Sequence, residues 1–109
     1  KSQLEAIEEE MVNYYRSVYG DSIDTIILYG SYARGDYSDD SDIDITAIVR
    51  GNRVELQKKL KKMWDFSTEV GLAYDVIISP TVIPYDEFEQ YKEKLPYYRN
   101  IVKEGRKIG

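Results

Sequence analysis

The 109-residue sequence contains no cysteine and no histidine. The chain therefore has no means of forming disulfides, zinc sites built on Cys or His, or Ser-His and Cys-His nucleophiles. No apolar run approaches the ~20 residues that a transmembrane helix requires, and no signal peptide is visible. We therefore expect a cytoplasmic protein with no membrane association.

Positive charge is also in short supply. Lys and Arg number 15 against 20 Asp and Glu, which gives a net charge of −5. Platforms that bind nucleic acid are usually basic, so this balance argues against direct nucleic-acid binding. The hydrophobic fraction of 42% is that of an ordinary globular protein, and the length predicts a single domain over residues 1–109.

The spacing of apolar residues predicts an alternation of helices and strands. Ser2 and Glu5 fit a capping box at the start of the first helix, and Gly20 fits its end. Pro80 and Pro84 are expected to break the chain after the third strand. The expected elements are helix 2–19, strand 23–29, loop 30–40 with at most a helical turn, strand 42–49, helix 52 to about 70, strand 73–79, and helices 85–94 and 96–104. This order predicts an α/β (α+β) fold with a small mixed β-sheet flanked by helices.

The stretch LYGSYARGDYSDDSDIDITAIV, Leu28 to Val49, concentrates negative charge just before an apolar strand. Side chains two residues apart in a strand share a face, so Asp42 and Asp44 point the same way. Two adjacent carboxylates repel each other, and without a cation one of them tends to stay protonated. Mg²⁺ prefers one or two carboxylates together with phosphate oxygens, so the pair is a candidate metal site.

A third carboxylate, Asp75, lies within the apolar run LAYDVIIS of the expected third strand. A charge in such a run needs a reason. If the second and third strands are neighbours, Asp75 lies beside Asp42 and Asp44, and three carboxylates can hold two metal ions about 3.5–4 Å apart. The alternative is that Asp75 marks an edge strand that faces solvent.

Glycines precede the acidic residues. Gly30 follows a strand directly, with Ser31 and Gly35 after it, and such a turn lets backbone N–H groups approach phosphate oxygens. A P-loop would continue with Lys and then Ser or Thr, but Asp36 and Tyr37 stand there, which excludes that motif. An EF-hand calcium loop also fails, because the required Gly and Glu are missing in both possible registers. Because the loop lacks the P-loop lysine, the charge of a bound phosphate would be neutralised by metal that the aspartates hold.

The segment GSYARGDYSDDSDIDI resembles the signature of the DNA polymerase β-type nucleotidyltransferase superfamily, in which Gly-Ser is followed by Asp-x-Asp. Asp75 in YDVII fits the carboxylate that the family places on a later strand. The form Gly-Ser-Tyr-Ala-Arg-Gly and the short length look most like the minimal nucleotidyltransferases, or MNT group. The chain departs from the family at Asp39 or Asp40, where Pro is common. The resemblance implies a nucleotidyltransferase fold like the palm of polymerase β.

The resemblance also implies an activity. Members transfer a nucleoside monophosphate, here AMP from ATP, to an acceptor hydroxyl and release pyrophosphate. Gly30 and Ser31 would bind the triphosphate, and Asp42 and Asp44 would hold two Mg²⁺ ions. Asp75 would complete the first metal site and help activate the acceptor oxygen. The other expected nucleotide contacts are Arg34, Gly35 and Ser41, with Arg34 alternatively paired to Asp36 or Asp39.

Partners follow from the same resemblance. Minimal members are often antitoxins paired with a HEPN-domain ribonuclease, and some transfer AMP onto a tyrosine of that toxin. The resemblance thus implies a HEPN-type partner protein. Two alternatives stay open: a non-catalytic antitoxin that occludes its partner, and a small-molecule nucleotidyltransferase. Tyr97, Tyr98 and Ile101 are either part of a docking surface or simple core packing.

Overall fold

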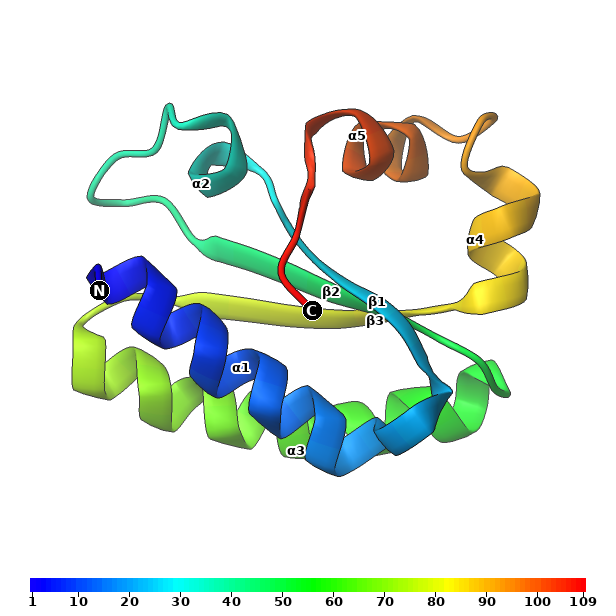
Figure 1. Cartoon of the computed structure of the whole chain (residues 1–109), viewed down its shortest axis with the longest axis horizontal. Coiled ribbons are helices and arrows are strands. Elements are labelled where there is room, and N and C mark those ends of the chain that lie inside the picture. Colours follow the sequence, from blue (N-terminus) through cyan, green and yellow to red (C-terminus); the bar gives the residue numbers. More distant parts are fainter.

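The computed structural model describes all 109 residues and forms one mixed β-sheet with helices on both faces (Figure 1). The strand order is β3-β2-β1-β4, in which β2 runs antiparallel to β1 and parallel to β3. The elements in chain order are α1 (Gln3–Tyr19), the 3₁₀ turn η1 (Gly20–Ser22), β1 (Ile23–Tyr29), α2 (Ser31–Arg34), β2 (Ile43–Val49), α3 (Arg53–Tyr74), β3 (Ile78–Pro84), α4 (Tyr85–Tyr91), α5 (Pro96–Glu104) and β4 (Arg106–Lys107). The predicted α/β fold with a small mixed sheet is confirmed.

The two faces of the sheet are covered unequally. The long helices α1 and α3 lie side by side beneath one face, whereas α4 and α5 lie over the other (Figure 1). The larger apolar core lies between the sheet and α1 and α3, and it includes Ile43 and Ile45 of β2. A smaller core lies under α4 and α5, and it consists of Ile27, Ile48, Ile83, Phe88 and Ile101. At one end of this second face Tyr29 and Asp44 are only half-buried, and we call that end the open face.

The first helix begins and ends as its sequence predicts. Ser2 accepts a hydrogen bond from the N–H of Glu5, and the Glu5 carboxylate accepts one from the N–H of Ser2. Gly20 ends the helix with a φ of 61°, a conformation that glycine adopts without strain. From inside the main core, the Tyr15 hydroxyl donates to the Thr81 carbonyl over 2.8 Å, which ties α1 to β3.

The third strand differs from its prediction. Helix α3 continues to Tyr74 instead of stopping near residue 70, and β3 begins only at Ile78, so the predicted strand 73–79 is wrong. Gly71 lies within the helix, where a Cβ would come within 2.6 Å of the Val76 carbonyl oxygen. Gly71 therefore does not end the helix. Because it has no side chain, the backbone at Val76 can fold back over the end of α3.

The prolines also differ from expectation, because Pro80 lies inside β3 and Pro84 is its last residue. The strand stands at the edge of the sheet, with β2 as its one neighbour. Proline is accepted at such an edge because the missing N–H can face away from the ladder. Strand 23–29 and helix 96–104 match their predictions, while α4 ends at Tyr91 and the two-residue β4 was not predicted. No helix combines the length and apolarity needed to cross a membrane.

Candidate active site

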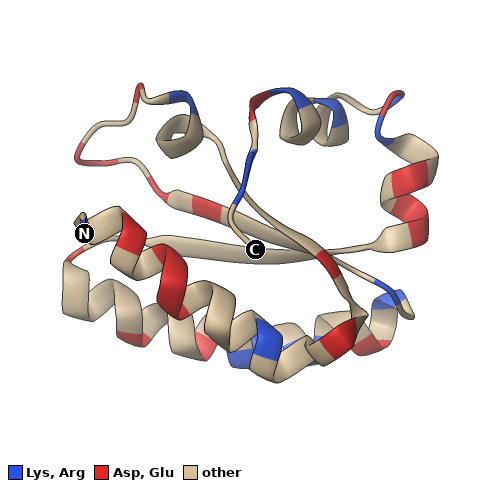
Figure 2. Ribbon diagram, viewed as in Figure 1, with Lys and Arg blue, Asp and Glu red and all other residues tan.

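Two carboxylates stand at the start of the central strand β2. Ile43 and Ile45 are fully buried in the main core, while Asp42 and Asp44 project to the other face, as the alternation predicts. Asp42 is exposed and Asp44 is half-buried. Acidic residues follow each other along the loop before β2 and into the strand (Figure 2). The open face of the sheet therefore begins with a pair of neighbouring carboxylates.

The surroundings of Asp44 disfavour its charge. Burial raises the pKa of its carboxyl above 3.8, and the negative charge of Asp42 raises it further, while Arg34 opposes both. The protein itself therefore supplies too little positive charge to balance the two carboxylates. A divalent cation relieves this repulsion directly.

The turn after β1 lies against this carboxylate. Gly30 has a φ of 75°, and a Cβ built on it would meet Asp44 Oδ2 at 2.5 Å. That separation is too short for any side chain, so Gly30 is required both by its backbone conformation and by the closeness of Asp44. Although Gly30 and Asp44 are well separated in sequence, β1 and β2 bring the glycine turn and the carboxylate pair into one site.

Helix α2 follows the turn at once and confirms the predicted helical turn in the loop. The N–H groups of Ala33 and Arg34 donate to the Gly30 carbonyl, each over 3.1 Å. The first amides of a helix, here those of Ser31 and Tyr32, have no partner within the helix and are suited to an anionic ligand. Gly35 ends α2 with a left-handed φ of 86°, and a Cβ added there would have no atom within 4 Å, so its conformation alone requires glycine.

Arg34 joins α2 to the last helix. Its guanidinium donates to Glu104 over 3.0 Å and to Asp36 over 3.3 Å. Of the two neighbours proposed from sequence, Asp36 is the partner and Asp39 is not. The contact with Glu104 links residues 70 positions apart, which no local pattern indicates. Both bridges are exposed to solvent, so they orient Arg34 more than they stabilise the fold.

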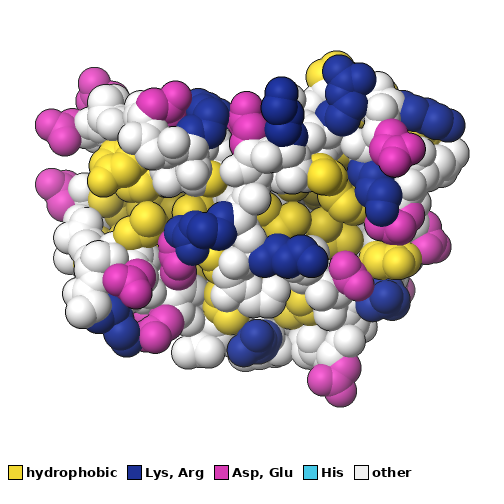
Figure 3. Space-filling view, turned by 45° about the horizontal axis from the view of Figure 1, so that its top comes forward, with side chains coloured by type: hydrophobic (Ala, Val, Ile, Leu, Met, Phe, Trp, Pro, Cys, Tyr) yellow, Lys and Arg dark blue, Asp and Glu magenta, His cyan; other side chains and the backbone are white.

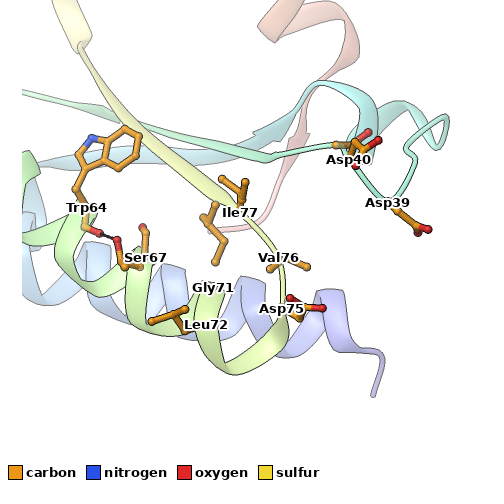
Figure 4. Close-up of a pocket in the computed structure, with 12 residues that line it drawn as sticks. Asp39, Asp40, Trp64, Ser67, Gly71, Leu72, Asp75, Val76 and Ile77 are labelled. Carbon is orange, nitrogen blue, oxygen red and sulfur yellow. Dashed lines mark hydrogen bonds between the residues drawn. The ribbon is translucent and has the colours of Figure 1, made fainter.

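Asp75 does not lie where the sequence predicts it. It ends α3 in a left-handed conformation, with φ 57° and ψ 48°, and it is exposed to solvent. No three Asp, Glu, Cys or His residues lie close enough together to hold a metal ion, so the predicted three-carboxylate cluster is not formed. Asp75 instead lines a pocket of about 580 Å³ that also involves Asp39, Asp40 and Trp64 (Figure 4).

The position expected for a third carboxylate on β3 is held by a serine. Ser79 pairs with Asp44 in the parallel register, and its hydroxyl lies 3.4 Å from Asp42 Oδ2. Ser41, predicted as a nucleotide contact, accepts a hydrogen bond from the Ser38 N–H over 2.9 Å and so shapes the loop that leads to Asp42.

The donor set suits Mg²⁺ with phosphate. Asp42 and Asp44 supply two carboxylates that repel each other, and burial together with that repulsion raises the pKa of the Asp44 carboxyl. Mg²⁺ is commonly held by one or two carboxylates, with its other positions filled by substrate phosphates and water. The pair fits such an ion without a third protein carboxylate.

Sequence reasoning did not assign Tyr29 or Thr46 to the site, and it named Tyr97 only as a docking or core residue. Tyr29 stands directly opposite Asp44 in the β1–β2 register, and its hydroxyl lies 2.9 Å from that of Tyr97. Thr46 is fully buried, and its hydroxyl has no hydrogen-bond partner. The strand alternation could have indicated Tyr29 and Thr46, since both share the face of Asp44 once the register is known. Nothing local places Tyr97 beside them.

The C-terminal aromatic region is divided between core and surface. Ile101 is buried in the smaller core, and the Tyr98 ring packs edge-on against Phe88, which supports core packing for these two. Tyr97 is half-exposed. On the face seen in Figure 3, apolar patches lie between interspersed basic and acidic side chains.

Known proteins resemble this chain in sequence over most of its length. The family model described as "Nucleotidyltransferase domain" matches residues 6–108. The "Putative protein adenylyltransferase MJ0604" of Methanocaldococcus jannaschii is 38% identical over 98 residues, which is 90% of each chain. A second protein of that organism, "Putative protein adenylyltransferase MJ0141", is 33% identical over 81% of this chain and 96% of its own.

Solved structures support the fold at lower identity. A crystal structure of a toxin-antitoxin with AMP-PNP has a TM-score of 0.56 and 16% identity, over 93% of this chain and 72% of that one. A tri-AMPylated Shewanella oneidensis HEPN toxin in complex with MNT antitoxin gives a TM-score of 0.53 and 16% identity, over 98% and 71%. With the family match covering nearly the whole chain, this protein belongs to the nucleotidyltransferase domain family.

Proposed function

We propose that residues 1–109 act as one Mg²⁺-dependent nucleotidyltransferase domain that transfers AMP from ATP to a hydroxyl group of a partner protein. The observation that carries the proposal is the close approach of the Gly30 backbone to the Asp44 carboxylate, which brings the glycine turn next to the carboxylate pair. The names of the similar archaeal proteins support adenylyl transfer to protein as the reaction.

The carboxylate pair and the glycine turn have different roles in binding the nucleotide. Asp42 and Asp44 would hold Mg²⁺, which supplies positive charge to the triphosphate when bound. Gly30 and Ser31 bind the phosphates through backbone N–H groups, because no lysine stands in the turn. The remaining predicted contacts, Arg34, Gly35 and Ser41, lie on the segment that joins these two parts of the site.

The transfer itself makes one bond and breaks one. The acceptor oxygen bonds to the α-phosphorus, pyrophosphate leaves with the electron pair of the broken P–O bond, and the hydroxyl proton is released. The chain contributes orientation, since Gly30 and Asp44 fix the triphosphate against the sheet. Asp42 is exposed and Asp44 is only half-buried, so an acceptor can approach the carboxylate pair from solvent.

The partner we propose is a HEPN-type protein, because structural neighbours of this chain are complexes of MNT antitoxins with HEPN toxins. The test is to incubate the chain with a purified HEPN-domain partner, Mg²⁺ and α-labelled ATP. Label on the partner that disappears in EDTA and in Asp44→Asn supports the proposal. Inhibition of the partner without ATP, and without any label, would instead establish the occluding antitoxin.

A further inference from the structure

A pair of tyrosine hydroxyls stands on the same face as the carboxylate pair. Tyr29 and Asp44 are direct partners across β1 and β2, and residues opposite each other in an antiparallel pair project to one face. The Tyr29 hydroxyl lies 2.9 Å from the Tyr97 hydroxyl, and their rings meet edge-on with centroids 6.0 Å apart. Tyr97 thus reaches from α5 toward the face that carries Asp44.

Tyr97 differs from its neighbour Tyr98 in freedom and access. The residue is 49% exposed and lies in the first turn of α5, and its one side-chain hydrogen bond is the contact with Tyr29. The Tyr98 hydroxyl is instead held by Glu87, which is itself paired to Arg53, and its ring packs on Phe88. Of these two adjacent phenols, only Tyr97 is directed at the open face.

We propose that Tyr97 is an internal acceptor, so that the chain adenylylates its own Tyr97 hydroxyl. This inference rests on the proposed function, because it uses the same nucleotide site and adds an acceptor within the chain. The Tyr97 oxygen forms a bond to the α-phosphorus of a nucleoside triphosphate. The bond from that phosphorus to the bridging oxygen breaks, pyrophosphate leaves with the electron pair, and the phenolic proton passes to solvent.

The modification has a consequence for the site. An adenylyl group on Tyr97 removes the phenolic hydrogen from the contact with Tyr29 and places a bulky anion over the face that a protein acceptor must approach. Self-modification therefore slows transfer to a partner. The chain modified on Tyr97 is a resting form of the enzyme.

The experiment incubates the purified chain alone with Mg²⁺ and α-labelled ATP, and maps the labelled residue by peptide mass spectrometry. We expect one adenylyl group on Tyr97, at a rate per molecule that does not change on dilution of the protein. Tyr97→Phe loses the label, and the matched variant Tyr98→Phe keeps it. Asp44→Asn also loses it, because the nucleotide site is disabled.

Binding of MgATP, measured by calorimetry on the same samples, distinguishes failure of the internal acceptor from failure of the proposed function. A wild-type chain that binds MgATP but acquires no label overturns the internal acceptor and leaves the proposed function standing. Label on Tyr29 or Tyr98, or a rate that falls on dilution, also overturns it. A chain that does not bind MgATP overturns both proposals together.

Discussion

Asp44 and Asp75 carry the same carboxyl group, yet the fold gives them opposite surroundings. Asp44 is half-buried on the central strand β2, with Gly30 against its oxygen and Asp42 beside it. Asp75 is exposed at the end of α3, across a pocket from the loop that carries Asp39 and Asp40 (Figure 4). Crowding that disfavours the charge of a carboxylate favours cation binding, and Asp44 has that crowding whereas Asp75 is exposed.

The largest expected effect is on transfer. Asp44→Asn should lower the rate of adenylyl transfer by at least about 100-fold, since it removes a proposed direct metal ligand and the loss of even indirect ligands costs ~10–100-fold. Asp75→Asn should leave the rate within about twofold, as expected of an exposed residue outside the site. The rates are measured with α-labelled ATP at saturating Mg²⁺. Equal losses in both variants would mean that Asp75 joins the metal site when nucleotide is bound.

A second comparison contrasts the two glycines of the turn. Gly30→Ala and Gly35→Ala each place a Cβ on a backbone with positive φ, which costs of order 1–3 kcal/mol of folding stability. Only the methyl group that Gly30→Ala introduces meets the Asp44 carboxylate. We therefore expect Gly30→Ala to melt at a lower temperature than Gly35→Ala, and we expect loss of MgATP binding mainly in Gly30→Ala at temperatures where both variants are folded. Equal binding by the two variants would place the phosphate site elsewhere.

The pH dependence of stability sharpens the contrast between the carboxylates. Because the pKa of Asp44 is raised in the folded state, folding favours the neutral carboxyl. The folding stability gained from the neutral carboxyl is lost as pH rises through the folded pKa. Without metal, Asp44→Asn should therefore melt at a higher temperature than wild type near pH 7, with the difference shrinking as pH falls through the raised pKa toward 3.8. Addition of Mg²⁺ should narrow the difference at pH 7. A lower melting temperature for the variant at pH 7 would contradict the unrelieved repulsion.

The smallest effect concerns the backbone at Asp75. Its left-handed conformation favours glycine and is tolerated by Asn, so Asp75→Gly should stabilise the chain by about 1 kcal/mol and Asp75→Asn should be nearly neutral. Urea unfolding measures both. Destabilisation of both variants would mean that the Asp75 side chain makes a contact that its exposure does not suggest.

The sequence predicted the site where its determinants are local. Strand alternation placed Asp42 and Asp44 on one face, and the turn residues placed Gly30 and the short helix after it. It failed at Asp75, because Val76 and the isoleucines after it look like a strand whether or not a helix precedes them. The true start of β3 depends on how Gly71 lets the chain fold back, which is a tertiary contact.

Contacts between distant segments could not be predicted from the sequence. The Arg34–Glu104 ion pair and the Tyr29–Tyr97 contact each need α5 to lie over the sheet beside α2. That placement follows from the packing of Ile101 and Phe88 against β1, β2 and β3 in the smaller core. No motif or periodicity encodes it.

The central claim is that the carboxylate pair, without Asp75, makes nucleotide binding depend on metal. Calorimetric titration of ATP into wild type, Asp44→Asn and Asp75→Asn, in EDTA and then in Mg²⁺, tests it most directly. We predict that Mg²⁺ strengthens ATP binding at least about tenfold in wild type and Asp75→Asn, but hardly at all in Asp44→Asn, since unscreened phosphate charge meets the aspartates without metal. Equal affinity in EDTA and Mg²⁺ for wild type, or loss of the metal effect in Asp75→Asn, would contradict the account.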